Sequence, residues 1–305
     1  MRKILLICIS LLCFALQKSA AQDSTLLNLL NDSLKQNGAP DYITGTFKAT
    51  RLVNLQTIES PAAGNLNFVI QHRFGQLNSG AYNFFGLDNA TLRLGFDYGI
   101  TDRLAVGVGR SSYQKTFDGY LKYKLLRQKN GLGSIPVSVS ILGSISNYTL
   151  HYPDKPFLNT KYRTAYLSQL LIARKFNRNF SIEIAPTYIH YNLVATTQDK
   201  NNVFALIGGS RLKITKRMSI EAEYNYLPSN QVVSTPIHNS FSLGWGIETG
   251  GHVFQLIFTN SQSMVASQYI TQTPGSWGNG DLYFGFNLSR NFTLTKHSKL
   301  HKDWK

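Results

Sequence analysis

The chain has 305 residues, of which only 15% are charged, and its formal net charge is +15. No run of eighteen consecutive apolar residues occurs, which excludes a transmembrane helix, and the many Gly, Tyr and Phe residues favour a large β domain with tight turns. At the N-terminus, two basic residues precede an apolar run over 4–16 and small residues at 19–21. This order predicts a signal peptide over residues 1–21 and hence export.

The segment over 22–63 precedes the regular part of the pattern, and we expect it to be an N-terminal segment that is periplasmic or plugs the barrel. Both cysteines, Cys8 and Cys13, lie in the predicted signal peptide, so the mature chain should contain no disulfide and no cysteine metal site. Residues 24–37 predict a short amphipathic helix, because leucines fall on one side and Gly38 follows.

Residues 44–58 are β-prone but carry Lys48 and Arg51 at their centre, which disfavours a strand that faces lipid. We therefore expect this segment to plug the periplasmic mouth of a barrel and to pair its two basic side chains with acidic residues in the lumen. The alternative is a thirteenth strand of the wall.

From residue 64 onward, apolar and polar residues alternate. Leu92, Leu94 and Phe96, for example, are interleaved with Arg93 and Asp97. Successive side chains of a strand point to opposite faces, and about ten tilted residues cross a bilayer. The pattern predicts an all-β fold, a single antiparallel transmembrane barrel over 64–292 with a basic tail over 293–305. Its twelve expected strand cores are 65–74, 90–100, 104–112, 116–127, 135–147, 163–176, 180–192, 202–214, 218–227, 239–249, 252–262 and 281–290.

Short turns recur with one pattern, an apolar residue, three polar residues and an apolar residue. The copies are Ile100-TDR-Leu104, Phe176-NRN-Phe180, Ile214-TKR-Met218 and, at the expected end of the last strand, Leu288-SRN-Phe292. Because such barrels keep short turns on the periplasmic side, the longer connections, including 263–280, should be extracellular. The Ile214–Met218 turn also sets a register in which Arg211 lies opposite Glu221 on the lumen face.

A long stretch over 86–128, GLDNATLRLGFDYGITDRLAVGVGRSSYQKTFDGYLKYKLLRQ, carries a family resemblance. Together with TFKATRLVNLQTIE at 46–59 and QHRFG at 71–75, it resembles the DUF5777 family of outer-membrane β-barrel proteins of the Bacteroidetes type. The resemblance implies the barrel fold and an outer-membrane location for most of the mature chain. It supplies no activity and no catalytic residues.

Charged residues on the polar faces are the candidate functional residues. They are either a selectivity lining for charged solutes or a salt-bridge ladder that fills a narrow barrel. The lumen candidates are Arg93, Asp97, Lys122, Lys124, Arg211, Glu221 and Glu223, with Arg73, Asp118, Glu183, Lys213 and Glu248 on the same faces. Other basic residues gather at the expected periplasmic rim, where they would contact anionic headgroups or attract anionic solutes.

Three further patterns could carry chemistry. His238 and Ser240 share a strand face, as in a lipid hydrolase, but no acidic or amide orienting partner and no oxyanion motif accompany them. His297 and His301 have metal-like spacing without a third ligand, and the GVGR sequence at 107–110 lies in a strand rather than before a helix. We expect no enzyme, no cofactor and no metal site.

The sequence therefore predicts a barrel of the Gram-negative outer membrane that acts as a pore for a small solute. The alternatives are a non-conducting structural or docking barrel and, third, an outer-membrane lipid hydrolase. The expected partners are outer-membrane lipid, the barrel-assembly machinery and a small solute. Nucleic acid is not an expected partner of a protein embedded in that membrane.

Overall fold

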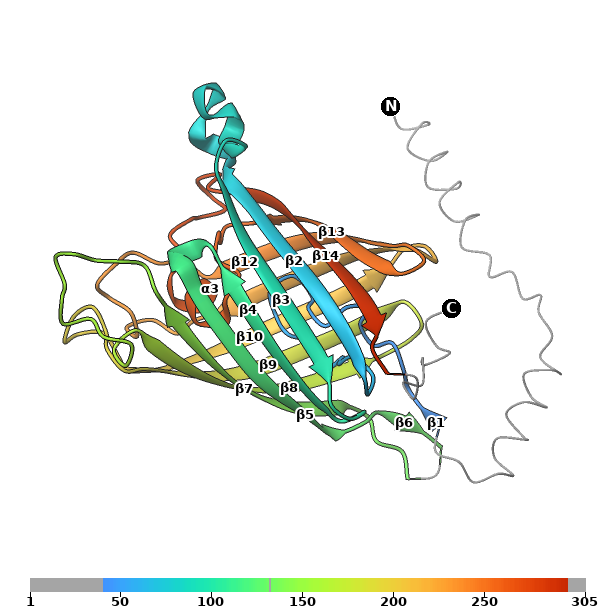
Figure 1. Cartoon of the computed structure of the whole chain (residues 1–305). Helices are drawn as coiled ribbons and strands as arrows, with labels where there is room; N and C mark the ends of the chain where they lie inside the picture. Colours follow the sequence, from blue (N-terminus) through green and yellow to red (C-terminus); the bar gives the residue numbers. More distant parts are fainter. Residues whose placement is uncertain (1–40, 132, 296–305) are drawn as a thin grey trace, which may run out of the picture. The chain divides into compact units, whose positions relative to one another are not determined.

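The computed structural model describes residues 41–131 and 133–295, and within them twelve strands close into an antiparallel barrel (Figure 1). The predicted signal peptide, the helix predicted over 24–37 and the part of the predicted tail from residue 296 lie outside the described residues. The wall strands are β2 (Asn65–Gln76), β3 (Ala90–Gly99), β4 (Leu104–Ser111), β5 (Thr116–Leu126), β7 (Ser138–Tyr148), β8 (Thr164–Lys175), β9 (Phe180–Tyr191), β10 (Asn202–Lys213), β11 (Met218–Tyr226), β12 (Ser240–Glu248), β13 (His252–Thr259) and β14 (Tyr283–Thr293).

The wall is a meander in which each strand pairs with the next along the chain, and β14 pairs with β2 to close it. Residues 44–58 are not a wall strand, so the alternative with thirteen strands is wrong.

The remaining elements are two short strands, three 3-10 turns and one helix. The strands β1 (Asp41–Tyr42) and β6 (Lys129–Asn130) pair with each other, the turns are η1 (Leu77–Ser79), η2 (Ala81–Gly86) and η3 (Tyr113–Lys115), and the helix is α3 (Ala266–Thr271). Within the described ranges, no helix has both the length and the apolar character needed to cross a bilayer.

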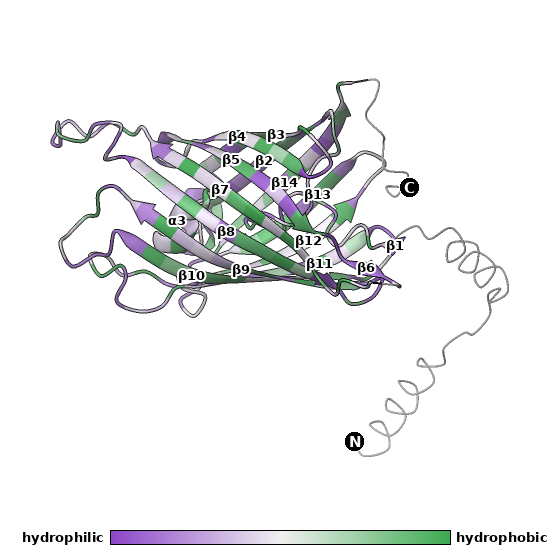
Figure 2. Ribbon diagram, turned by 90° about the horizontal axis from the view of Figure 1, so that it is seen from below, coloured by the Kyte–Doolittle hydropathy of each residue, from purple (hydrophilic) through white to green (hydrophobic). Residues whose placement is uncertain are grey.

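The predicted alternation is confirmed along the wall. On β3, for example, Arg93 and Asp97 are buried in the interior, whereas Leu94 and Phe96 are 40% and 45% exposed on the outside. Figure 2 shows this alternation of hydrophobic and hydrophilic residues along the strands. An outward apolar face is stable only if lipid rather than water covers it, which is the arrangement of a membrane barrel.

Three of the four repeated motifs are hairpin turns, as predicted. In each turn, the N–H of the first apolar residue donates to the carbonyl of the second, for example Ile214 to Met218 at 2.9 Å. The first polar residue also accepts from the backbone: Thr215 Oγ1 receives the N–H groups of Arg217 and Met218 at 3.2 and 3.0 Å. This side-chain bond explains why Thr or Asn opens each motif. The predicted register is also confirmed, since Arg211 pairs with Glu221.

The fourth motif does not mark the end of the last strand. β14 continues through it to Thr293, and Phe292 and Thr293 pair with Leu66 and Asn65 at the start of β2. The reason is closure: β2 begins at Asn65, so its closing partner has to extend equally far to satisfy those backbone groups.

The connection over 260–282 also differs from the prediction of a simple external loop. It contains α3, whose residues from Ser267 to Thr271 are all buried. Tyr269 is 1% exposed and belongs to the same apolar cluster as wall residues such as Leu171. This connection therefore turns back into the barrel from the end that carries the long loops.

Candidate functional site

The barrel interior is occupied by residues 46–59, which we call the inner loop. Its centre is a tight hairpin, in which Leu52 N–H donates to Leu55 O at 2.9 Å and Thr57 N–H donates to Thr50 O at 2.9 Å. Its ends are joined by the Glu59 carboxylate, which accepts from Thr46 N–H at 2.9 Å. The loop therefore holds its own shape.

Wall side chains from all around the barrel bind this loop through its backbone. Glu223 Oε2 on β11 accepts the N–H groups of residues 53–55 at 3.3, 2.8 and 2.8 Å. Glu183 Oε2 on β9 accepts Ile58 N–H at 2.8 Å. From β5, Lys122 Nζ donates to the carbonyls of Thr57, at 2.9 Å, and of Glu59. The charges predicted to face the lumen thus satisfy the backbone of a loop that has no partner in the wall sheet.

Amides on β13 and β14 complete this shell around the tip of the hairpin. Asn287 Nδ2 donates to Val53 O at 2.8 Å, and Gln255 Nε2 donates to Leu52 O. From β2, Arg73 Nη2 donates to Asn54 Oδ1 at 3.0 Å. The tip is therefore held by neutral amides as well as by charges.

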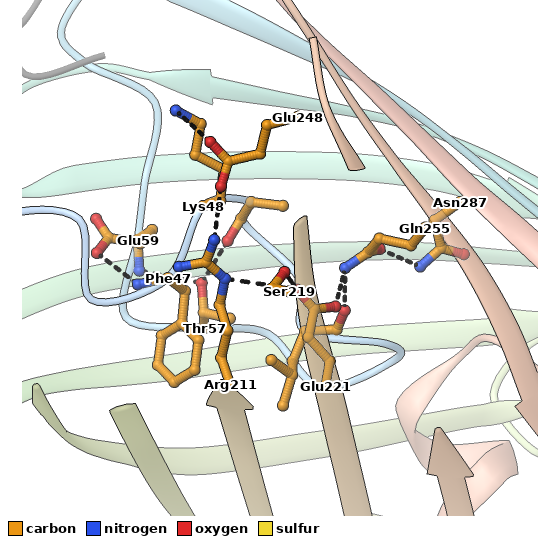
Figure 3. Close-up of polar contacts among 12 residues, drawn as sticks. Phe47, Lys48, Thr57, Glu59, Arg211, Ser219, Glu221, Glu248, Gln255 and Asn287 are labelled. Carbon is orange, nitrogen blue, oxygen red and sulfur yellow. Dashed lines mark hydrogen bonds and ion pairs between the residues drawn. The ribbon is translucent and has the colours of Figure 1, made fainter. Parts of the chain in front are cut away.

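Figure 3 shows a connected polar chain on the β10–β13 side of the interior. Lys48 Nζ lies 3.3 Å from Glu248, which accepts from Arg211 Nη2 at 2.6 Å. Arg211 Nε lies 3.7 Å from Glu221, and Glu221 accepts from Gln255 Nε2 at 2.5 Å. These contacts link a charge of the inner loop to four wall strands, β10 to β13.

The two basic residues of the inner loop, Lys48 and Arg51, have different kinds of partner. Lys48 pairs with the lumen acid Glu248, as expected. Arg51 is buried and donates to Asn54 O at 3.2 Å within the hairpin, so the expected pairing with a lumen acid is wrong for this residue. The acids nearest to it already have other partners, since Asp118 binds Arg93 and Asp97 accepts from Thr50 Oγ1 at 2.8 Å.

The remaining lumen candidates lie on β3 and β5. Arg93 forms a two-pronged pair with Asp118, at 2.9 Å from Nε and 2.5 Å from Nη2. Lys124 is half-buried on the inner face of β5. The structure therefore contains local ion pairs, as in a salt-bridge ladder, and it also contains charge-to-backbone contacts that sequence reasoning missed.

The glycines of the GVGR sequence make room for these side chains. A Cβ atom on Gly107 would overlap the Tyr120 ring, and one on Gly109 would overlap the Arg93 guanidinium. The motif lies inside β4, as expected. It is a packing feature, in which two absent side chains let an arginine and a tyrosine lie flat against the wall.

Toward β8, β9 and β10, the inner loop also meets an apolar surface. Inward residues of β8, β9 and β10 such as Leu171, Ile189 and Ile207 are fully buried and form one cluster with Leu52 and Leu55 of the inner loop. The sequence over 163–176 does not alternate regularly between apolar and polar residues, and this cluster explains why. The outer face of β8 is apolar where it contacts lipid, and its inner face is apolar where it packs against the inner loop.

Four of the nine basic residues of the expected rim contact aromatic rings or the backbone. Arg127 lies 4.3 Å from the ring of Tyr42, and Lys175 Nζ donates to Thr44 O at 2.8 Å. The rim residues predicted from sequence were Arg103, Arg127, Lys129, Arg174, Lys175, Arg178, Lys216, Arg217 and Arg290. Cation–π stacking places the charges of Arg127, Arg174 and Arg290 beside aromatic rings, as expected near an interface between membrane and water.

The candidate catalytic pair does not assemble. Ser240 is fully buried at the inner face of β12, whereas His238 is exposed in the preceding loop. Among residues 41–131 and 133–295, no group of three potential metal ligands occurs, and His297 and His301 lie outside these ranges.

A family model described as a membrane-bound β-barrel domain (DUF5777) matches residues 47–292, which include both the inner loop and the wall. No curated protein matches the sequence. Among solved structures, the NanC porin is 10% identical with a TM-score of 0.47, and the match covers 75% of this chain and 100% of that one. The KdgM porin is 8% identical (TM-score 0.45, 74% and 99% covered), and the outer membrane phospholipase A from Escherichia coli is 9% identical (TM-score 0.44, 82% and 96% covered).

Proposed function

Because the chain belongs to the DUF5777 family of membrane-bound β-barrel domains, we propose that it is an outer-membrane channel for a small solute that the inner loop closes. The observation that best supports this proposal is the way in which the inner loop is held inside the barrel. Wall side chains bind the loop, as Glu223 does when it accepts the N–H groups of residues 53–55. The loop is not itself a strand of the wall sheet. A segment held in this way can leave without breaking the barrel.

Opening exposes two kinds of surface. The wall charges, such as Lys122 and Glu183, become hydrated when the loop leaves, so water replaces the lost backbone partners. The apolar contacts, such as Leu55 with the β8–β10 wall, have no such replacement, and their exposure costs about 25 cal/mol per Å². The closed state is therefore favoured at rest, and opening needs a trigger such as a bound solute or a periplasmic partner.

In this proposal, the lumen candidates have two roles. While the loop is in place, Glu223, Glu183 and Lys122 bind its backbone. Once the loop has moved, the same side chains line the pore together with Arg93 and Glu221. The channel lies in the outer membrane, contacts its lipid, and is inserted by the barrel-assembly machinery.

Planar-bilayer conductance tests the proposal. A chain lacking residues 22–60 should insert and conduct more than the full chain. Val53→Cys with Gly244→Cys provides a lock, because a Cβ atom on Gly244 would lie 3.3 Å from Val53 Cγ2, close to disulfide geometry. Oxidation should abolish the residual openings of the full chain and reduction should restore them, whereas Gly244→Cys alone should not respond to oxidation.

A second candidate function is a docking barrel, favoured by the hairpin that connects β2 and β3. Its tip presents Tyr82, Phe84 and Phe85, which are 96%, 59% and 53% exposed. A folded deletion variant that gives no current would contradict the channel and favour this alternative. Folding is checked by the heat-modifiable gel mobility of barrels, and location by recovery in the outer-membrane fraction.

A further inference from the structure

A large cavity lies at the end of the barrel that carries the long loops. Its volume is about 760 Å³, within the usual range for small-molecule sites. The loops over 149–163, 192–201 and 227–239 surround it, and α3 contributes Ser267, Gln268 and Thr271 to its lining. None of the lumen candidates lines it, so the cavity is formed by other residues than those that bind the inner loop.

Hydrogen bonds fix the loops that form its sides. Asp199 Oδ1 accepts Val233 N–H at 2.7 Å and Ser234 N–H at 3.0 Å, which ties the second loop to the third. Arg163 shapes the first loop, because its guanidinium donates to Leu150 O at 2.6 Å and to Leu158 O at 2.9 Å.

The helix α3 is fixed to the wall as well. Tyr191 OH donates to Ser267 O at 2.7 Å. Gln268 Nε2 donates to Gln114 Oε1 and to Thr116 Oγ1, both at 2.9 Å. The sides and the α3 end of the cavity are thus formed before a ligand arrives, which lowers the entropy cost of binding.

The lining combines aromatic rings with positive charge. Five tyrosines and one phenylalanine line it: Tyr113, Tyr148, Tyr152, Tyr162, Tyr191 and Phe157. The basic residues are Lys155, Arg163 and Lys200. The acid on the lining, Asp199, already accepts four hydrogen bonds, two from Thr196 in its own loop and two from the backbone of the 227–239 loop.

We propose that this cavity binds a small organic anion that carries a ring. The anionic group pairs with Lys155 and Lys200, whose side chains are exposed and able to move toward it. The ring packs on the tyrosine faces, where stacking adds to simple burial. A neutral ligand of the same shape loses the first interaction, and a small anion without a ring loses the second.

Equilibrium binding to the full chain in lipid nanodiscs tests this, and it does not require the barrel to conduct. The probes are 2-naphthoate, its neutral amide 2-naphthamide, glucuronate and acetate. We expect 2-naphthoate to bind about tenfold more tightly than the amide, the effect of two charge contacts. Acetate should bind more weakly than either ring-bearing acid. If 2-naphthoate binds more tightly than glucuronate, the preferred ring is aromatic, and if glucuronate binds more tightly, the preferred ring is a sugar.

Two matched variants locate the site. The first combines Lys155→Gln with Lys200→Gln and should reduce the affinity for 2-naphthoate to that for the amide. The second combines Lys129→Gln with Lys216→Gln, which makes the same charge change at the other end of the barrel, and should leave the affinity unchanged. Tyr152→Leu should weaken 2-naphthoate more than acetate. Equal binding of the acid and the amide, equal binding of acetate and both ring acids, or an unchanged affinity in the Lys155/Lys200 variant would overturn the proposal.

Discussion

Toward β3, β5 and β11 the inner loop meets buried charges, whereas toward β8–β10 it meets mainly leucine, isoleucine and alanine, with Glu183 on β9 as the exception. On the polar side, each contact is directional: Glu223 accepts three N–H groups, and Lys122 donates to two carbonyls. On the apolar side, Leu171 and Ile207 offer close packing without direction. The polar side therefore fixes the position of the loop, and the apolar side supplies most of the cost of removing it.

The largest effect is expected on the apolar side. Leu171→Ala should lower the free energy of unfolding by about 2–5 kcal/mol, because a fully buried side chain leaves a cavity. Its neighbour Leu170, 37% exposed on the outer face, is the control, and Leu170→Ala should cost less because lipid fills the space. Urea unfolding in lipid vesicles measures both, and equal losses would contradict the packing difference.

A smaller and more local effect is expected on the polar side. Glu223→Gln keeps an acceptor but removes the charge, which should weaken the hold on the hairpin tip by about 1.5–3 kcal/mol. Amide hydrogen exchange at residues 53–55 should then be at least about tenfold faster. Glu248→Gln, which removes a carboxylate that does not contact these amides, is the control. Unchanged exchange in Glu223→Gln would show that packing alone holds the tip.

The ion pair at the edge of the polar side should contribute less. Lys48 and Glu248 are 24% and 13% exposed, so solvent screens their attraction. A double-mutant cycle with Lys48→Met and Glu248→Gln should give a coupling energy of about 0.2–1 kcal/mol. The same cycle on the buried pair Arg93 and Asp118 should give a larger value, and equal couplings would contradict the role of burial.

The smallest effect is expected outside the membrane, where Asp199 binds backbone N–H groups as Glu223 does inside. Burial alone would raise the pKa of Asp199, but hydrogen bonds from Val233, Ser234 and Thr196 outweigh it and lower the pKa well below the usual value. A lowered folded pKa means that this stabilisation is present above about pH 3.9 and is lost as the pH falls from there toward the folded pKa. Limited proteolysis of the 192–201 loop should therefore change little between pH 7 and 5 and increase at lower pH. Asp199→Asn should remove that pH dependence, and an unchanged profile in this variant would contradict it.

Much of the wall was predictable because its signals are local. The alternation around Arg93, the turn from Ile214 to Met218 and the pairing of Arg211 with Glu221 all depend on residues close together in the sequence. The poor alternation of strand 163–176 was visible too. The cause of this poor alternation could not be predicted, because the inner face of β8 packs against a loop more than a hundred residues away in the chain.

The sequence by itself determined which residues form strands and which faces they present, because strand period and turn chemistry act over a few residues. Only the tertiary structure decided what the inward charges bind. Glu223 is 170 residues from Val53, and Ile58 is 125 residues from Glu183, so these contacts exist only once the barrel has closed around the inner loop. The same closure turned α3 inward, because a buried Tyr269 finds apolar partners only in an interior that the inner loop and β8–β10 form together.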